Sequence, residues 1–330
     1  MKGMAKQQLI KQSMIWIVLM PMLSFYPLGL FAQKMDTSFT LYSAYHKISR
    51  QHPEAVWFDN VKIPDDVRQH EFVYDSTLAT PLSVIVIAPK SEQASLVPVL
   101  IIHGGGWASG NPAMHTSLAV LLAQKGYTVF LPEYRLSGTA IYPAAAIDLL
   151  HLIRWMDLHT SALNIHMPHL VYAGFSAGGT LASLIAQPGF QQQYASELSG
   201  RIYPGMALID LDGTLSFVHP ESTEGDDSKR ISAATRWLGC PRKQCPQVWE
   251  QASPLFYTGA DAPPTLFINS SVSGMHAGRN DYVSRLQQSG IVTRVIEWPD
   301  APHTFCLFHP WLNAVSYEVA RFIGDVKPLN

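Results

Sequence analysis

Apolar runs of strand length alternate with helical patterns along most of the chain. Residues 97–103 and 169–175 are almost wholly apolar, which is typical of strands buried on both faces of a parallel sheet. Between these runs, residues 113–126 and 143–160 have the spacing of helices, the first ending at a glycine and the second beginning at a proline. The alternation predicts an α/β fold with a mostly parallel sheet and helices on both faces.

The same pattern continues to the end of the chain. Further strands are predicted at residues 82–89, 127–134, 202–211, 264–269 and 293–298, and further helices at residues 177–187, 281–290 and 311–324. Residues 212–262 are the least regular part and are rich in Pro, Asp and Ser. We therefore expect a single domain over residues 33–330, with a lid-like insertion at about 212–262.

The first 32 residues have a different character. Lysines precede an apolar run that ends at Ala32, which predicts a cleaved signal peptide and a periplasmic or secreted protein. A membrane anchor is the alternative because the run is about long enough to span a bilayer. Pro21 and Pro27 interrupt the run, and no cysteine stands near the cut, so neither a stable membrane insertion nor a lipoprotein anchor is predicted.

Composition narrows the classes of partner. The 330 residues carry a net charge of −2 and only 15% charged residues, with no basic run, so nucleic acid is not an expected partner. Cys240 and Cys245 stand five positions apart, and in an oxidising compartment they could close a small disulfide loop. No ligands stand at metal spacing, and Cys306 is expected to be a buried thiol. No feature argues for a subunit interface.

A motif stands between a predicted strand and a predicted helix. Residues 174–178 have the sequence GFSAG, which matches G-x-S-x-G. In this context a sharp turn holds the serine hydroxyl clear of the sheet edge, and glycines let the turn pass its neighbours. The motif predicts Ser176 as a nucleophile, the alternative being a glycine-rich connection without chemistry.

A glycine-rich stretch follows the predicted central strand, with the sequence HGGGWASG over residues 103–110. Glycine lets backbone N–H groups approach a developing oxyanion, and losing one such donor costs roughly 3–4 kcal/mol. We expect Gly105 and Gly106 to donate, with Ala177 N–H as their partner. Trp107 N–H is an alternate donor. A phosphate-binding loop is the other interpretation, but the G-K-[ST] sequence that it needs is missing.

A late loop carries the candidate base. Residues 298–305, with the sequence WPDAPHTF, follow the last predicted strand. A histidine there can take the proton of the nucleophile and return it to a leaving alcohol. The chain has 13 histidines, and His303 is singled out by order and placement, because the serine comes first, the histidine last, and each stands at a strand end. His103 is expected to orient the oxyanion loop and His309 to be structural.

Together these motifs resemble an α/β-hydrolase. HGGGW, GFSAGG, the stretch from 248 to 268 and PHTF are most similar to the bacterial dienelactone-hydrolase-like and feruloyl-esterase-like branch, which also resembles hormone-sensitive-lipase-type esterases. The resemblance covers about residues 80–328. It implies an α/β-hydrolase fold and serine esterase chemistry that needs no cofactor and no metal.

The resemblance leaves the catalytic acid in an unusual place. The family keeps it in a turn that falls near Ser271 here, but residues 267–281, with the sequence FINSSVSGMHAGRND, offer no acid before Asp281. We rank Asp212 first, because it ends the strand after the nucleophile helix, and Asp281 second. Asp300 shares the base loop but would need a cramped turn, and Asp210 is expected to face a neighbour within its strand. A dyad without an acid is the remaining alternative.

Polar residues are expected around the mouth of the site. His276 and Arg279 follow the odd loop, and residues 219–230 add acidic and polar side chains, unless these form only a solvated loop. Aromatic edges are expected from Trp107, Trp237 and Trp249. A lid that covers a fatty chain should be apolar, whereas a polar rim with aromatic edges suits sugars. Resemblance to secreted esterases that strip acyl groups from plant polysaccharides implies the same.

We therefore expect an exported serine esterase that removes acetyl or a similar small acyl group from a carbohydrate ester through an acyl-enzyme. Within enzymes, the alternative is a methyl or feruloyl esterase acting on pectin or xylan. A peptidase is disfavoured because nothing indicates a propeller or a peptide-anchoring domain. Outside enzymes, the alternative is a non-catalytic carbohydrate-binding pseudo-hydrolase. The displaced acid favours it, but backbone strain like that of the serine turn persists where function uses it.

Overall fold

One sheet of eight strands organises the part of the chain that the computed structural model describes, residues 38–57, 61–91 and 96–327. The strand order is β1-β2-β4-β3-β5-β6-β7-β8. The pairs β1–β2 and β2–β4 are antiparallel, and the others are parallel. The strands are β1 Val67–Asp75, β2 Leu82–Pro89, β3 Pro98–Ile102, β4 Thr128–Pro132, β5 Val171–Phe175, β6 Ala207–Leu211, β7 Thr265–Asn269 and β8 Thr293–Glu297.

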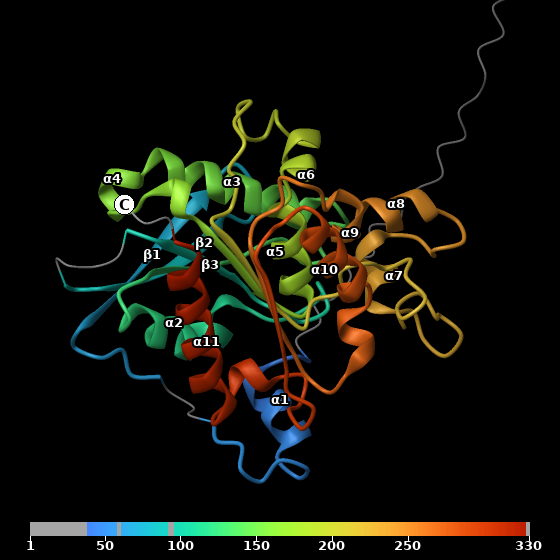
Figure 1. The fold of residues 1–330 in the computed structure, drawn as a ribbon, viewed down its shortest axis with the longest axis horizontal. Coiled ribbons are helices and arrows are strands. Elements are labelled where there is room, and N and C mark those ends of the chain that lie inside the picture. Colours follow the sequence, from blue (N-terminus) through green and yellow to red (C-terminus); the bar gives the residue numbers. More distant parts are fainter. Residues whose placement is uncertain (1–37, 58–60, 92–95, 328–330) are drawn as a thin grey trace, which may run out of the picture. The chain divides into compact units, whose positions relative to one another are not determined.

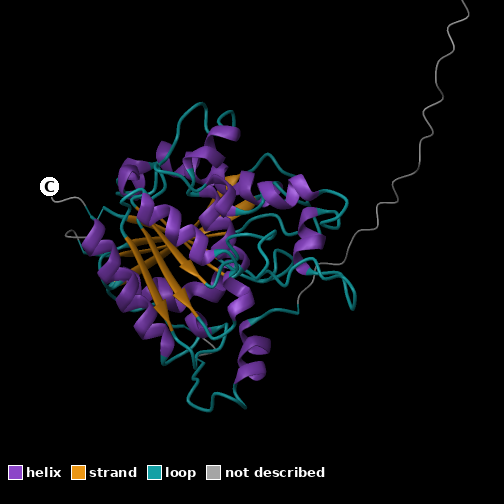
Figure 2. Cartoon of the chain, turned by 45° about the vertical axis from the view of Figure 1, so that its right-hand side comes forward, coloured by secondary structure: helices purple, strands orange, loops and turns teal. Residues whose placement is uncertain are grey.

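Helices connect the strands and cover the sheet on both faces. Figure 1 shows α2 and α11 on one side of the sheet and α3 on the other, and Figure 2 shows the strands between the helices. This arrangement confirms the predicted α/β fold. The α-helices are α1 Leu41–Ile48, α2 Thr116–Ala123, α3 Ala144–Leu158, α4 Thr160–Leu163, α5 Ala177–Ile185, α6 Pro188–Gln193, α7 Ala233–Leu238, α8 Pro246–Gln251, α9 Pro254–Tyr257, α10 Arg279–Gln288 and α11 Trp311–Val326, and the 3₁₀ helices are η1 Pro112–His115, η2 Met167–His169, η3 Ser273–His276 and η4 Phe305–Leu307.

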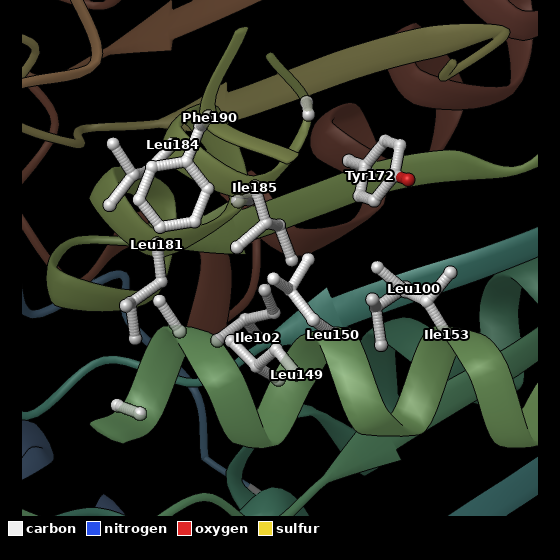
Figure 3. Packing of buried hydrophobic residues seen from close by; sticks show 14 of the residues in the cluster. Leu100, Ile102, Leu149, Leu150, Ile153, Tyr172, Leu181, Leu184, Ile185 and Phe190 are labelled. Atoms are coloured by element: carbon white, nitrogen blue, oxygen red, sulfur yellow. The ribbon is translucent and has the colours of Figure 1, made fainter. Parts of the chain in front are cut away.

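The central strands bury side chains on both faces, as their continuous apolar runs predict. In β3, Leu100 and Ile102 join the core beneath α3 and α5, while Val99 and Ile101 join the core beneath α2 and α11. Figure 3 shows the first of these cores, where leucines and isoleucines of α3 and α5 pack against β3 and β5. The apolar packing fixes the strand register, and the register aligns the ends of β3, β5, β6 and β7 at one edge of the sheet.

Strand β1 and helix α1 were not predicted from the pattern, and neither were the short helices α6, α7, α8 and α9. In β1, six consecutive residues from 68 to 73 are exposed, so this edge strand shows neither an apolar run nor an alternation. Helix α1 is short and begins with a capping box at Thr40. Its segment also pairs with the far end of the chain, through two backbone hydrogen bonds of 3.0 and 3.2 Å between Val56 and His309. Such a contact depends on the tertiary fold.

The segment expected to form a lid-like insertion contains three short helices, α7, α8 and α9. Cys240 and Cys245 form a disulfide between α7 and α8. Trp237 and Trp249 are at most 1% exposed and lie in the same core as α3 and α5. The expectation that these tryptophans edge the mouth of the site is therefore wrong. The segment's role as a lid stays a prediction.

The predicted signal peptide, residues 1–32, lies outside the described residues. Within the described ranges, no helix combines the length and the apolar character needed to span a membrane. Export and localisation stay predictions.

Candidate active site

Ser176 stands on the sharp turn between β5 and α5. Its backbone has φ 56° and ψ −122°, a strained conformation for a residue with a side chain. The turn is held because Ser176 N–H donates to Leu211 O at 2.9 Å. A side chain at Gly178 would collide with the carbonyl oxygen of Ile102, so only glycine lets α5 pass β3 this closely. The turn leaves the Ser176 side chain partly exposed.

The glycine-rich loop after β3 lies directly against this serine. A methyl group at Gly104 would lie 3.1 Å from Ser176 Cβ. Gly105 and Gly106 have φ values of 121° and 59°, which favour glycine. Neither of their N–H groups donates to another described residue, and Ala177, the first residue of α5, has no acceptor within its helix. These three N–H groups are thus unused by the described residues next to the nucleophile, and their role as oxyanion donors stays a prediction.

Buried histidines support the oxyanion loop. His103 Nδ1 lies 2.8 Å from Gly104 O, and the His103 ring stacks on Tyr134 at 4.4 Å. His115, in η1, packs edge-on against Phe175 at 6.0 Å. Burial lowers the pKa of His103 to about 4 and that of His115 to about 3. Both rings are therefore neutral at neutral pH, and His103 can orient the loop without adding charge beside the oxyanion.

His303 links the nucleophile to an acid. Its Nε2 lies 2.9 Å from Ser176 Oγ, and its Nδ1 lies 2.9 Å from Asp212 Oδ2. A carboxylate only accepts hydrogen bonds, so Nδ1 carries the proton and Nε2 is free to accept the proton of Ser176. The ring also packs on Phe175 at 4.8 Å. The three residues ranked first in the sequence therefore form one hydrogen-bonded chain.

Asp212 comes from the end of β6, and the end of β7 supplies its donors. Its carboxylate is fully buried. Asp212 Oδ1 accepts from Ser270 N–H at 2.8 Å and from Asn269 Nδ2 at 3.3 Å. The next residue, Ser271, donates from its hydroxyl to Ala301 O of the base loop at 3.2 Å. The turn where the resembled family keeps its acid thus holds both the relocated acid and the loop of the base.

Asp210 faces neighbouring residues from its strand, as expected, but its position beside the acid was not predicted. It is fully buried two residues before the acid. Its Oδ1 accepts from Gly213 N–H at 2.9 Å, and its Oδ2 accepts from Ser183 Oγ at 2.9 Å. These bonds close a turn around Asp212, whose φ is 56°. Burial raises the pKa of Asp210 to about 7. The signal in the sequence was the repeated Asp of residues 209–213, IDLDG.

Two expected site residues have other roles. Asp281, the second candidate acid, has an exposed carboxylate that lies 3.5 Å from His219 Nε2, while Asp212 already occupies His303 Nδ1. Arg279 was expected to bind substrate, but it is 9% exposed. It donates to Asn269 Oδ1 at 2.8 Å and pairs with Glu297 at 2.7 Å. Asp281 is therefore not the acid that pairs with His303. Arg279 is not a substrate contact either, because its guanidinium group holds the Asn269 amide that supports Asp212.

The other two expected substrate contacts differ from each other. Trp107 is 4% exposed and stacks on Trp237 at 4.4 Å, so its ring is part of the core, and the expectation that it edges the site is wrong. His276 is half-buried at the end of η3. Burial lowers its pKa, although Asp212 acts in the opposite direction. A neutral imidazole beside the acid can donate to or accept from a bound molecule, and its contact with substrate stays a prediction.

No group of three or more His, Cys, Asp or Glu side chains in the described ranges is arranged to hold a metal ion. The arrangement that is present contains an activated hydroxyl, a base, an acid and backbone donors for a negative oxygen. This set performs acyl transfer from an ester to water.

Comparisons with known proteins agree with this chemistry. An ethyl acetate hydrolase from Pseudomonas putida is 28% identical over 233 residues, which cover 68% of this chain and 71% of the relative. An esterase from Gibberella moniliformis is 27% identical over 240 residues, covering 69% and 73%. From this relationship the protein is a carboxylic ester hydrolase.

Solved structures show the same fold. A bacterial heroin esterase superposes with a TM-score of 0.67 at 19% identity, covering 87% of this chain and 91% of the other. A truncated carbohydrate esterase from gut microbiota gives a TM-score of 0.64 at 18% identity, covering 80% and 98%. The fold is thus that of the α/β-hydrolase esterases. The BD-FAE family model matches residues 85–291. Because this match spans more than half of the 330 residues, the chain belongs to the BD-FAE family.

Proposed function

We propose that the protein is an exported serine esterase that removes acetyl or a similar small acyl group from carbohydrate esters. The observation that carries the catalytic part is the continuous hydrogen-bonded chain from Asp212 through His303 to Ser176. Such a chain, next to unused backbone N–H groups, is the arrangement by which a neutral hydroxyl becomes a nucleophile.

The reaction follows from these positions. Ser176 Oγ attacks the ester carbonyl carbon while His303 Nε2 takes the hydroxyl proton. The carbonyl oxygen becomes an oxyanion that accepts from the N–H groups of the 105–106 loop and of Ala177. His303 then gives its proton to the leaving alcohol, and an acyl-enzyme remains. Water then gives a proton to His303 Nε2 and attacks the acyl carbon. The bond between this carbon and Ser176 Oγ breaks, His303 returns the proton to Ser176 Oγ, and the carboxylic acid leaves.

Two features favour a small acyl group. The ring of Trp107 packs against Phe217 at 5.6 Å and against Trp237 at 4.4 Å, and all three are nearly or fully buried. The ring of Trp107 therefore belongs to the core and is not available to line a slot for a larger, aromatic acyl group. A relative that hydrolyses ethyl acetate, as its name states, releases an acetyl group of the same size class.

Three features favour a carbohydrate as the alcohol. The loop of residues 218–231 is mostly exposed and carries acidic and polar side chains. It packs against η3, because a methyl group at Gly274 would lie 3.1 Å from Thr223. Glu221 accepts from Gly278 N–H at 3.1 Å in the same region. A structural neighbour is described as a carbohydrate esterase from gut microbiota. A polar border of this kind suits hydroxyl-rich substrates more than fatty chains.

The test compares the mature wild-type protein with Ser176→Ala on 4-nitrophenyl acetate, acetylated oligosaccharides, methylated pectin and methyl ferulate. We expect wild-type hydrolysis of both acetyl esters, loss to background in Ser176→Ala, and slower reaction with the other two substrates. A fluorophosphonate should label wild type and leave Ser176→Ala unlabelled.

Wild-type rates equal to those of Ser176→Ala on every ester would overturn the catalytic proposal and favour the pseudo-hydrolase. Preference for methylated pectin or methyl ferulate would overturn the acyl group proposed here while leaving the serine mechanism intact.

A further inference from the structure

A depression of about 670 Å³ lies between the segment that contains α1 and the residues that follow the oxyanion loop. Besides apolar residues, its described lining includes the polar and aromatic residues Thr40, Tyr42, Trp57, Gln69, Asn111 and Thr116. None of the described residues that line it carries a charge. It is separate from the Ser176–His303–Asp212 chain, and the mechanism does not use it.

The depression is connected to the oxyanion loop on one side. A side chain at Gly110 would collide with the carbonyl oxygen of Gly104, so these two residues are in contact. Asn111 is the next residue, one Cα step of about 3.8 Å further along. Two more lining residues, Met114 and Thr116, flank His115, whose ring contacts Phe175 just before the nucleophile.

On its other side, the depression is connected to the loop of the base. Val56 precedes Trp57 and pairs with His309, six residues after His303. Tyr45 of α1 contacts the ring of Phe308 at 5.8 Å. Figure 1 shows α1 beside the chain that leads into α11. The depression therefore lies between two segments that each continue from a loop of the catalytic centre.

The described part of the lining is neutral and amphipathic. Tyr42 is 59% exposed, and its ring lies 5.9 Å from that of Trp57. Trp57 Nε1 is buried and has no hydrogen-bond partner among the described residues. The side chains of Gln69, Asn111 and Thr116 make no hydrogen bond with another described residue. Aromatic faces beside amide and hydroxyl groups match a ligand with alternating C–H and O–H groups.

We infer that this depression binds neutral sugar units of the glycan whose ester is cleaved at Ser176, an inference that rests on the proposed function. A charged chain, such as a polyuronate, would lose hydration here without gaining a countercharge from the described lining. A fatty chain would cover the amide and hydroxyl groups and leave them unpaired. A neutral oligosaccharide pairs those groups and stacks its C–H faces on Tyr42 and Trp57.

The binding test uses the protein without the predicted signal peptide, residues 1–32, and otherwise complete. It carries Ser176→Ala, so that no ester is hydrolysed. Calorimetric titrations use xylohexaose and cellohexaose as neutral probes and hexagalacturonic acid as the charged probe. We expect binding of at least one neutral probe, with an affinity at least tenfold higher than that for the charged probe. Adding Trp57→Ala or Asn111→Ala should weaken this binding at least tenfold.

A matched pair of tyrosines supplies the control. Tyr42 and Tyr317 are both 59% exposed, but Tyr317 lies on α11 and outside the depression. Tyr42→Ala should weaken neutral-probe binding, and Tyr317→Ala should leave it unchanged. Asn111→Ala and Tyr42→Ala alter partly solvated side chains, so they keep the test valid if Trp57→Ala fails to fold.

Three outcomes overturn the inference. The first is that neither neutral probe binds. The second is that a neutral probe binds Tyr42→Ala and Tyr317→Ala equally well. The third is that hexagalacturonic acid binds more strongly than both neutral probes. Hydrolysis of 4-nitrophenyl acetate by wild type is measured in parallel. If wild type hydrolyses this ester but binds no neutral probe, the sugar subsite is refuted and the esterase remains. If it binds through Tyr42 and Trp57 but hydrolyses no ester, the proposed function is refuted and the sugar site remains.

Discussion

Asp212 combines a left-handed backbone with a buried carboxylate, and both of its oxygens are occupied by hydrogen-bond donors. An asparagine here would keep the shape but present an N–H or a neutral oxygen to His303 Nδ1. The imidazole would then lose its preferred tautomer and the charge that stabilises its protonated form. For Asp212→Asn we expect kcat to fall roughly 1,000- to 10,000-fold with KM changed less than about twofold, measured on 4-nitrophenyl acetate.

Asp281→Asn is the matched control for that substitution. Its carboxylate is exposed and pairs only loosely with His219, so we expect kcat within about twofold of wild type. A large loss in Asp281→Asn, together with a small one in Asp212→Asn, would contradict the assignment of the acid.

Strand β6 and the turn that follows it form one element whose shape depends on Asp210. An alanine at 210 would free Gly213 N–H and Ser183 Oγ, and the turn around Asp212 would lose its anchor. An asparagine would retain both bonds, because its oxygen accepts from Gly213 and its amide donates to Ser183 Oγ. We expect kcat to fall at least tenfold in Asp210→Ala and to stay within about threefold in Asp210→Asn, with KM little changed in either.

Asp210 also makes the free energy of unfolding depend on pH. Burial raises the pKa of Asp210 to about 7 from 3.8, so the folded protein binds a proton that the unfolded chain releases between these values. Its stabilising contribution is therefore complete below pH 3.8 and is lost as the pH rises to about 7. Asp210→Asn has no titrating group at this position and therefore lacks this pH-dependent contribution to stability. In urea unfolding, its stability relative to wild type should increase from pH 4 to pH 7 and stay constant above; a constant difference throughout would contradict the raised pKa.

At the scale of the whole molecule, the two buried histidines that support the oxyanion loop contribute to how the protein's stability responds to acid. The folded pKa values of His103 and His115, about 4 and about 3, lie below the ordinary 6.5. Below pH 6.5 the unfolded chain therefore takes up protons that the folded protein does not. The free energy of unfolding should therefore decrease as the pH falls below 6.5, by up to about 1.4 kcal/mol per pH unit for each histidine.

His115 offers a clean test, because both of its ring nitrogens are buried without a partner among the described residues. His115→Phe keeps an aromatic ring against Phe175 and removes the titrating group. Its urea-unfolding free energy should exceed that of wild type by an increasing amount as the pH falls from 6.5 to 4. The exposed His70→Gln should follow the wild-type curve, and a His115→Phe curve parallel to wild type would refute the explanation.

Much of this molecule was predictable because its signals are local. The buried strands β3 and β5 are continuous apolar runs, and G-x-S-x-G needs only its own glycines and the adjacent strand and helix to make a nucleophile turn. The edge strand β1 gave no such signal, because six of its consecutive residues face solvent. Trp107, Trp237 and Trp249 were predicted to edge the site but lie in the core. The residue type alone does not distinguish a tryptophan at the rim of a site from one in the core.

The sequence by itself determined the α/β architecture, the nucleophile turn and the loop that carries His303, because each depends on neighbours along the chain; the oxyanion role of the glycine-rich loop stays a prediction. Only the tertiary structure decided which aspartate completes the site. Asp212 meets His303 because the ends of β6 and β7 lie side by side, so that Ser270 and Asn269 can hold its carboxylate. It also showed that Arg279 supports this acid and that Tyr42 and Trp57 lie beside the residues that follow the oxyanion loop. Asp212 and His303 stand 91 positions apart in the chain, and only the packing of the strands and of the loops that follow them brings the two side chains within hydrogen-bonding distance.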